Sequence, residues 1–476
     1  ILCLGLDDVH NLLNLLAAIA LLVWGTHTVR TGILRVLGAS LRDVLARSVK
    51  KPLWAFVSGV GVSSLLQSST ATCLIVGSFV GQGVFMTSTA LIMMLGADVG
   101  TSLMALMFSF DLSWLSPLLI VVGVVVFVAN QNNTLGRWGR VAIGLGLMTL
   151  ALHLIVEATK PITQSNGMHV LLSVLPNDPV ILILIGALLT VISYSSLAMV
   201  LLTATLCQTE VVSLPMALGL VLGANLGSGL LAFLTMSKSP AEVRRVPLGN
   251  LLFKAIGCAL AVPFLGFYMP VADDIQAWGF DAVVSFHFLF NAVLSVCMVM
   301  LTGQLGEWLT QYLPSTHIDT NKVQPKYLDP TALSTPSLAI ACAAREALHQ
   351  ADVVEAMLRG IVPVIQNDDA ELAAKLREMD DGVDDLYSAI KFYLTQISRE
   401  ALSQREGQRW ADIMSFAINM EQVGDIIERV LQDIEDKKIA KGRKFSEAGF
   451  SEIEDLHQRL VANLQLGMSE IGRAHV

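Results

Sequence analysis

The 476-residue sequence is poor in charged residues, aromatic residues and cysteine. Charged residues make up 15% and aromatic residues 7% of the chain, whereas 54% of its residues are apolar and its mean hydropathy is +0.62. This composition is more apolar than that of an average soluble protein. An excess of positive charge is also missing, because the net charge is −9. That acidic balance excludes nucleic acid as an electrostatic partner.

The six cysteines lack the paired spacing that disulfide frameworks and thiolate metal sites require. Five of them lie in or beside apolar runs, as small apolar side chains in a membrane interior would. We therefore expect neither thiol catalysis nor a thiolate metal site, and nothing in the sequence indicates an enzyme. The cysteines are Cys3, Cys73, Cys207, Cys258, Cys297 and Cys342.

The charges divide the chain into two chemically different parts. Residues 1–315 hold 13 Lys/Arg and 13 Asp/Glu, whereas residues 316–476 hold 18 and 27. We expect a transmembrane domain over 1–305, a linker over 306–336 and a soluble helical domain over 337–469. The chain begins at Ile1 without a methionine, so we expect the natural start upstream; residues 470–476 resemble translated adapter DNA and are expected to be an artefactual tail.

Nine apolar stretches predict the membrane architecture. A simple helix crosses the hydrocarbon in about 20 residues, but the stretches at 53–80 and 180–207 are too long for one straight crossing. Each also carries a polar cluster at its middle, Gln67–Thr70 in the first and Ser193–Ser196 in the second. The other stretches are 11–29, 84–109, 114–130, 141–157, 211–236, 248–270 and 284–305.

The positions of basic residues predict the orientation of these stretches. By the positive-inside rule, the basic loops 30–51, 131–140 and 237–247 are cytoplasmic. Three crossings between the first two loops would place them on opposite sides. A re-entrant hairpin at 53–80 removes this conflict, and a hairpin at 180–207, entering from outside, does the same for the second half. The prediction is seven full spans and two hairpins, with the C-terminal part in the cytoplasm.

The two halves match without a gap at an offset of 127 residues. Ser68 pairs with Ser195, Ser69 with Ser196 and Asp98 with Asn225, and the run Leu95–Ala97 pairs with Leu222–Ala224. An odd number of full spans separates the hairpins, so the two copies are inverted in the membrane. Inverted repeats with broken helices are typical of secondary transporters. We therefore predict an all-α, polytopic membrane protein.

The hairpin tips have the chemistry to bind ions. Unpaired backbone groups at membrane depth survive only where they line a polar cavity. The N-termini of half-helices attract an anion, and hydroxyl and carbonyl oxygens suit Na⁺. We predict phosphate binding by Gln67, Ser68, Ser69, Thr70, Ser195 and Ser196, and Na⁺ binding by Ser68, Ser69, Asp98, Ser195 and Asn225.

Alternatives stay open at single residues. Each serine could instead serve helix packing. Asp98 is either a cation ligand or proton carrier, or a carboxylate satisfied by backbone N–H groups of a Gly96–Gly100 turn. Arg244 and Arg245 either gather phosphate at the cytoplasmic mouth or mark the topology. His287 and Asn291 are expected mainly to make interhelical hydrogen bonds.

Over residues 10–305 the chain resembles the bacterial Na⁺/phosphate cotransporter family. The resemblance lies in Gln67–Thr72, in the Gly-Ala-x-x-Gly runs 96–100 and 223–227, in Arg244-Arg245, and in His287-x-x-Phe-Asn291. It implies that both serine clusters form the substrate and Na⁺ sites. The second cluster departs from the family pattern, with Tyr194 in place of a glutamine and Leu197 in place of a hydroxyl or small residue. This departure implies that one Na⁺ site is weakened or lost.

The C-terminal part predicts four helices near 336–362, 368–400, 403–437 and 446–469, with Thr335 as N-cap and Pro336 at the first helical position. It resembles the PhoU-like domain through Asp380–Asp384 and Asn419–Asp425. The resemblance implies a metal cluster, divalent or iron-type, at Asp380, Asp384, Glu421 and Asp425. The alternative is an ordinary solvated acidic face.

The leading hypothesis is a transporter of inorganic phosphate coupled to Na⁺, in the bacterial cytoplasmic membrane, regulated by the C-terminal domain and its protein partner. The transport direction and the Na⁺ stoichiometry stay open, and a homodimer is one possible assembly. Two alternatives are a phosphate-sensing membrane receptor without net transport and a transporter of another small oxyanion.

Overall fold

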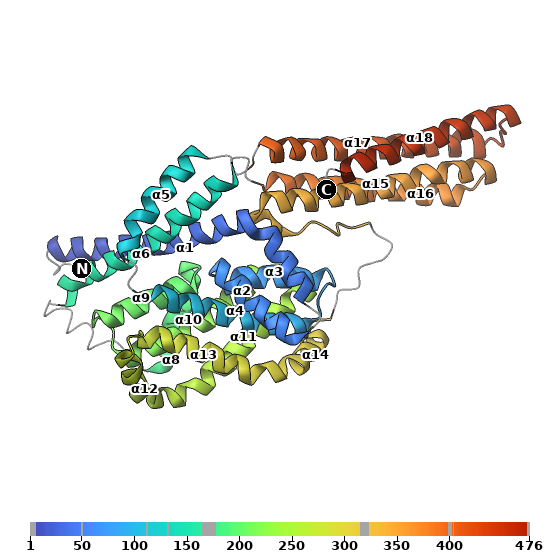
Figure 1. The fold of residues 1–476 in the computed structure, drawn as a ribbon. Helices are drawn as coiled ribbons and strands as arrows, with labels where there is room; N and C mark the ends of the chain where they lie inside the picture. The colour runs from blue at the N-terminus through green and yellow to red at the C-terminus, as the bar shows by residue number, and fades with distance from the viewer. Residues whose placement is uncertain are drawn as a thin grey trace. The chain divides into compact units, whose positions relative to one another are not determined.

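The computed structural model describes residues 6–48, 51–110, 113–130, 133–163, 178–314, 323–397, 402 and 404–473. The chain divides into a membrane unit, Ile1–Thr316, and a C-terminal unit, His317–Val476. Every regular element in the described residues is helical (Figure 1), which confirms the all-α prediction. Cys3 and the last residues of the predicted tail, 474–476, lie outside the described residues.

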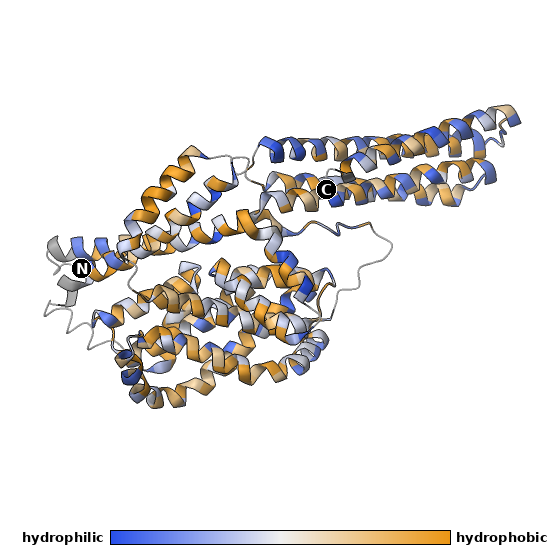
Figure 2. Ribbon diagram, in the orientation of Figure 1, coloured by the Kyte–Doolittle hydropathy of each residue, from blue (hydrophilic) through white to orange (hydrophobic). Residues whose placement is uncertain are grey.

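Six helical segments of the membrane unit are long and apolar enough to cross a membrane, so the chain is a multi-pass membrane protein. They are His10–Gly38, Thr87–Phe108, Thr134–Thr159, Leu214–Thr235, Ala241–Ala277 and Ala282–Tyr312. These segments coincide with six of the seven predicted spans. The seventh prediction, 114–130, falls on the shorter helix α5, Ser116–Ala129, whose 14 residues extend about 21 Å. Figure 2 shows α5 to be hydrophobic along its length.

The predicted loop at 30–51 is mostly helical. Helix α1 runs without interruption from Leu6 to Arg47, about 63 Å, so it continues well past the thickness of a hydrocarbon core. The prediction of a loop was wrong because the basic residues there mark the end of the apolar stretch and not the end of the helix. Helix α6, Thr134–Thr163, packs along α1 and against α5.

The two over-long apolar stretches are each a pair of short helices. The first contains α2, Pro52–Leu66, and α3, Ser69–Gly81. The second contains α8, Pro179–Ser193, and α9, Ser196–Gln208. A residue in the left-handed region ends the first helix of each pair, with φ of 54° at Gln67 and 53° at Tyr194. Non-glycine residues seldom adopt this conformation, and it stops a helix. The breaks therefore fall at the predicted polar clusters.

A third helix completes each repeat, α4 over Thr87–Phe108 and α10 over Leu214–Thr235. All three helix pairs have equal lengths, of 15, 13 and 22 residues, and all begin 127 positions apart. Helix α3 contacts α10, and α9 contacts α4. The second helix of each hairpin thus packs against the third helix of the other repeat, and the two repeats interlock.

Glycines let the first and third helices of each repeat approach closely. A Cβ atom on Gly96 would lie 2.1 Å from the carbonyl oxygen of Phe56, and one on Gly223 would lie 2.3 Å from that of Ile183. Small residues of this kind are typical of close helix contacts in membranes. Gly96–Gly100 is therefore part of a continuous helix, and the alternative of a glycine-rich turn around Asp98 was wrong.

Two longer helical segments follow the repeats. Helix α11, Ala241–Ala261, continues through the short turn Val262–Phe264 into α12, Leu265–Ala277. Helix α13, Ala282–Met298, continues through Val299–Leu301 into α14, Thr302–Tyr312. Helix α14 covers residues 306–312 of the stretch predicted as a linker, 306–336.

The C-terminal unit consists of four helices around an apolar core. They are α15, Pro336–Asn367, α16, Ala370–Thr395, α17, Gln404–Ile434, and α18, Glu447–Arg473, with a π-helical turn at Glu435–Ile439. Thr335 is the N-cap of α15 and Pro336 its first residue, as predicted. Helices α15, α16 and α17 contact one another and α18 packs on α15, so the predicted bundle is confirmed (Figure 1).

Candidate functional site

The two helix breaks share one backbone design. Ser68 is the N-cap of α3 and its Oγ accepts a hydrogen bond from the N–H of Ala71 at 3.2 Å. Ser195 is the N-cap of α9 and its Oγ accepts from the N–H of Ala198 at 3.1 Å. Serine favours this position because its hydroxyl satisfies one of the orphan amides of the first turn. The amides of the first two residues of each helix, Ser69 and Thr70 in α3 and Ser196 and Leu197 in α9, have no intrahelical acceptor and stay available to an anion.

A cation that the sequence did not associate with the site lies beside the first break. Arg30 of α1 donates from Nη1 to Ser68 Oγ at 3.4 Å, and its Nη2 contacts His27 Nδ1 at 3.2 Å. In the sequence Arg30 served only as a marker of the cytoplasmic side. Residue 30 was predicted to lie in a loop, whereas it lies within α1, which places the guanidinium next to Ser68 at the break.

Asp98 forms a buried ion pair with a lysine that the sequence analysis missed. Lys254 Nζ of α11 lies 2.8 Å from Asp98 Oδ1, and the two side chains are 1% and 4% exposed. Lys254 Nζ also donates to Ser228 Oγ at 2.5 Å. Asp98 belongs to α4 and Ser228 to α10, so the ammonium joins the two repeats. The sequence could have indicated this ion pair, because a lysine inside the apolar stretch 248–270 requires a partner for its charge.

Asn225, the repeat mate of Asp98, is held by α13. Its Nδ2 lies 3.0 Å from His287 Nδ1, and its Oδ1 accepts from Asn291 Nδ2 at 2.9 Å. All three side chains are buried. The prediction of His287 and Asn291 as interhelical hydrogen bonders is therefore confirmed.

The two breaks differ in the side chains around the shared backbone. Gln67 is buried and its Oε1 has no hydrogen-bond partner, whereas Tyr194 is 63% exposed. Leu197, the repeat mate of Thr70, is buried at 1% exposure and offers no hydroxyl, and Ser69 of the first break is buried at 4%. The structure thus reproduces the repeat in the backbone, while no hydrogen bond in the described residues joins the predicted ligands of the two clusters.

Arg245 has a structural role. Its Nε and Nη2 donate to the carbonyl oxygen of Leu313 at 2.9 and 2.7 Å, at the C-terminal end of α14. A cation favours such a position because it faces the negative end of the helix dipole. The neighbouring Arg244 has a buried Nε without a partner, so it keeps a donor for another group.

A separate cavity of about 400 Å³ lies among α4, α6 and α9. Its lining contains none of the predicted ligands. The residues are Phe108, Ser109, Phe110, Thr149, Leu152, His153, Val156, Leu201, Ala204, Thr205 and Gln208.

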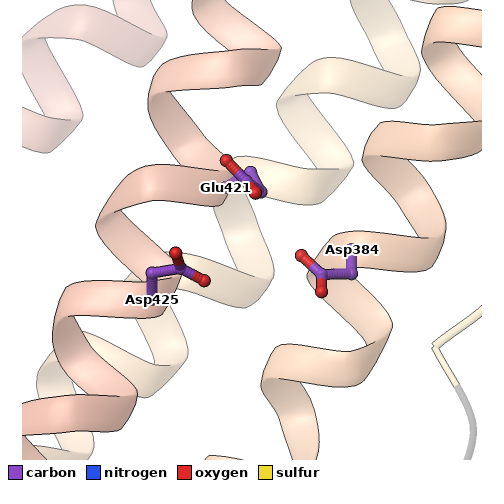
Figure 3. Close-up of side chains that lie close together, drawn as sticks. All are labelled: Asp384, Glu421 and Asp425. Atoms are coloured by element: carbon purple, nitrogen blue, oxygen red, sulfur yellow. The ribbon is translucent and has the colours of Figure 1, made fainter.

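In the C-terminal unit, three of the four predicted acidic residues lie together. Carboxylate oxygens of Asp384, Glu421 and Asp425 are all within 4.8 Å of one another, across α16 and α17 (Figure 3). Asp380 lies one turn before Asp384 and is 8% exposed, with a buried Oδ1 that has no partner. Gly424 makes room for it, since a Cβ there would lie 2.5 Å from that oxygen.

Burial and mutual repulsion disfavour ionisation of these carboxyls. Burial, then Asp384 and other nearby carboxylates, raise the pKa of Asp380 to about 6. The pKa of Asp384 is raised by burial and by Asp425, and that of Glu421 by the same two causes. An all-oxygen donor set with one unpartnered buried oxygen fits a hard cation.

Comparison with known proteins agrees with this architecture. The family model described as Na⁺/Pi-cotransporter matches residues 21–157 and again residues 160–296, more than half of the chain, and the model of the PhoU domain matches residues 348–434. Each of the two transporter matches contains one of the two repeats. No solved structure matches the chain.

Two enterobacterial relatives are similar along nearly the whole chain. A protein of Salmonella typhimurium named "Putative inorganic phosphate export protein YjbB" is 49% identical over 96% of this chain and 84% of its own length. The protein of the same name from Escherichia coli K12 is 47% identical over the same shares. The "Uncharacterized protein YqeW" of Bacillus subtilis is 25% identical over 64% of this chain and 99% of its own length. The chain therefore belongs to the Na⁺/Pi-cotransporter family of phosphate transporters and carries a PhoU domain at its C-terminal end.

Proposed function

We propose that the chain is a secondary transporter that moves inorganic phosphate across the bacterial cytoplasmic membrane, coupled to Na⁺, with its C-terminal unit in the cytoplasm. The observation that carries the proposal is the pair of serine-capped helix breaks at repeat-related positions. Each break offers hydroxyls and unpaired first-turn amides, and these donors suit phosphate oxygens.

Charges near the breaks support phosphate as the substrate. Arg30 contributes a guanidinium at Ser68 Oγ, and guanidinium groups bind phosphate well. We propose that phosphate is held by Gln67, Ser68, Ser69 and Thr70 from the first break and by Ser195 and Ser196 from the second. Alternating access would then expose this site to one side of the membrane at a time.

Na⁺ coupling rests on the oxygens that remain for a cation. Asp98 Oδ1 and Asn225 Oδ1 are both engaged by protein donors, whereas Gln67 Oε1 and Asp98 Oδ2 have no partner. We propose that Na⁺ binds mainly to oxygens of the breaks, including those of Ser68, Ser69 and Ser195. The name of the enterobacterial relatives supports outward movement of phosphate.

We further propose that the C-terminal unit regulates transport through a cation at Asp380, Asp384, Glu421 and Asp425. A divalent or iron-type cation would neutralise the repulsion among these carboxylates, which in turn would fix α16 against α17. We also propose that a regulatory protein binds to this unit or that the chain assembles as a homodimer. In either case, a change in the position of α16 relative to α17 would alter that interaction.

Purified full-length protein in proteoliposomes tests the proposal. Uptake of radiolabelled phosphate is measured with an imposed Na⁺ gradient and with the same gradient of choline. We expect flux that rises with Na⁺ and is not inhibited by a tenfold excess of sulfate. Equal flux in both salts would remove the coupling, and phosphate binding without flux would favour a receptor.

A further inference from the structure

Lys254 stands out among the charged residues of the membrane unit. Its side chain is 1% exposed, in the part of α11 that belongs to the predicted apolar stretch 248–270. Ionisable residues inside membrane spans are rare and costly, and they generally serve a function. The lysine belongs to neither repeat, since the repeats end with α10, but its ammonium lies between them.

The partners of the ammonium are oxygens of the kind that bind a hard cation. Asp98 Oδ1 lies at 2.8 Å and Ser228 Oγ at 2.5 Å from Lys254 Nζ. Asp98 was predicted as a Na⁺ ligand from the sequence, and Ser228 is the repeat mate of Thr101. A lysine ammonium is a compact point charge, so it fills a position between α4 and α10 that would suit a small monovalent cation.

The second oxygen of the Asp98 carboxylate, Oδ2, is buried and makes no hydrogen bond. In a purely structural ion pair, further hydrogen bonds usually satisfy the remaining oxygen, because a buried carboxylate with an unpaired oxygen is costly. Asp98 therefore retains an oxygen that can coordinate a cation.

We propose that the Lys254 ammonium is a tethered cation that takes the place of one Na⁺ between the repeats. The protein then carries one Na⁺ fewer per phosphate than it would with a neutral residue at this position. This inference rests on the proposed function, and it predicts that removing the ammonium creates a Na⁺ site at Asp98.

The first test measures binding without transport. Thermal unfolding of the purified full-length protein is followed in detergent over a series of NaCl concentrations, with choline chloride keeping the ionic strength constant. We expect Lys254→Met to unfold at a lower temperature than the wild type in choline, and Na⁺ to restore its stability in a saturable way. The double variant Asp98→Asn with Lys254→Met lacks the carboxylate and should lose this added response.

Lys238→Met is the matched control, because Lys238 is exposed and the substitution is the same. Its response to Na⁺ should equal that of the wild type. A Na⁺ response that is the same in Lys254→Met, in the double variant and in the wild type would overturn the inference and leave Lys254 as a structural charge.

The second test is flux in proteoliposomes. The order of the dependence of phosphate uptake on Na⁺ concentration should rise by one in Lys254→Met relative to the wild type. An active variant with an unchanged order contradicts the tethered cation. Absence of phosphate flux in the wild type contradicts the proposed function instead, and the thermal unfolding result then still decides the role of Lys254.

Discussion

At the scale of single residues, the proposed site depends on hydroxyls that cap helices and that we expect also to bind the solute. Ser68 and Ser195 cap α3 and α9 with almost the same geometry. A cap hydroxyl at the mouth of a helix can also donate to an anion, because an oxygen that accepts from an amide still carries its own hydrogen. One serine hydroxyl can therefore cap the helix and donate a hydrogen bond to a bound anion.

We predict that Ser68→Ala and Ser195→Ala each reduce phosphate transport by at least about tenfold, because each removes a hydrogen bond to a charged group, which contributes about 1.5–3 kcal/mol. Ser69→Ala should act in the same direction. Initial rates in proteoliposomes, corrected for the amount of inserted protein, measure the effect.

Ser446→Ala is the control for the loss of the cap itself. Ser446 Oγ accepts from the N–H of Gly449 at 3.1 Å at the start of α18, so it repeats the cap geometry in the C-terminal unit. The substitution should cost about 1 kcal/mol of helix stability and leave the transport rate near that of the wild type. Equal losses in all variants would indicate a folding effect only.

A second prediction concerns the buried carboxyl Asp380. Its pKa of about 6 lies above the ordinary value of 3.8, so the folded protein binds a proton more readily than the unfolded chain. Stability from this group is therefore present below about pH 4 and is lost as the pH rises through about 6. Asp380→Asn should raise the free energy of unfolding of the C-terminal unit at pH 7 by about 1–2 kcal/mol and flatten its pH dependence.

Thermal unfolding of the full-length protein between pH 5 and pH 8 measures this, with a chelator present because a bound cation would oppose the repulsion. Asp381→Asn, at an exposed neighbour, is the control. A loss of stability in Asp380→Asn at pH 7 would show that the carboxylate makes a favourable contact that the structure does not contain.

Prediction from the sequence is uneven at this scale. The matched serines, Asp98 and Asn225 were accessible because an ungapped repeat places polar residues in register. Lys254 and Arg30 were not, because each owes its role to contacts between helices that are distant in sequence. The side-chain partners of Asp98 depended on packing among α4, α10 and α11, which periodicity alone does not determine.

At the scale of elements, α2 packs closely on α4 and α8 packs closely on α10, and a residue in the left-handed region ends both α2 and α8. The excessive length of the two apolar stretches and their central polar clusters predicted the breaks, and the positive-φ residues Gln67 and Tyr194 lie in those clusters. The alternative of a turn at the glycine run was wrong because glycine also serves close helix contact, and only the partner helix distinguishes the two uses.

We predict that Gly59→Ala destabilises the membrane unit strongly, whereas Gly61→Ala in the same helix does not. A Cβ on Gly59 would lie 2.1 Å from the carbonyl oxygen of Met93, while one on Gly61 would meet nothing within 4 Å. Overpacking costs about 1–3 kcal/mol. The clashing atom here belongs to the backbone of α4, which can shift less easily than a side chain. Gly186→Ala should repeat the effect, because its Cβ would lie 2.3 Å from the carbonyl oxygen of Leu220.

The yield of monodisperse protein after extraction and its unfolding temperature measure these effects. Equal behaviour of the variants at Gly59 and Gly61 would contradict the close packing of α2 on α4.

At the scale of the whole molecule, the inverted repeat requires the loops to alternate between the two sides of the membrane. We predict that a membrane-impermeant maleimide labels Trp278→Cys on intact cells, in a background without other cysteines, and labels Ser239→Cys only after permeabilisation. Trp278 is 76% exposed at the end of α12. Labelling of both from the same side would overturn the topology.

The charge carried in one cycle bears on direction. Each Na⁺ that accompanies phosphate adds one positive charge, and one elementary charge is worth about 2.3 kcal/mol per 100 mV of membrane potential. A tethered ammonium does not cross the membrane. A transporter with one Na⁺ fewer therefore carries a more negative net charge, which an inside-negative potential drives outward.

We propose that both helix breaks hold the same phosphate ion. Binding of radiolabelled phosphate to the purified full-length protein, measured by equilibrium dialysis, tests it most directly. We predict one phosphate per chain and a loss of affinity of at least about tenfold in Ser68→Ala and in Ser195→Ala alike. Undiminished binding in either variant would contradict a site shared by the two repeats.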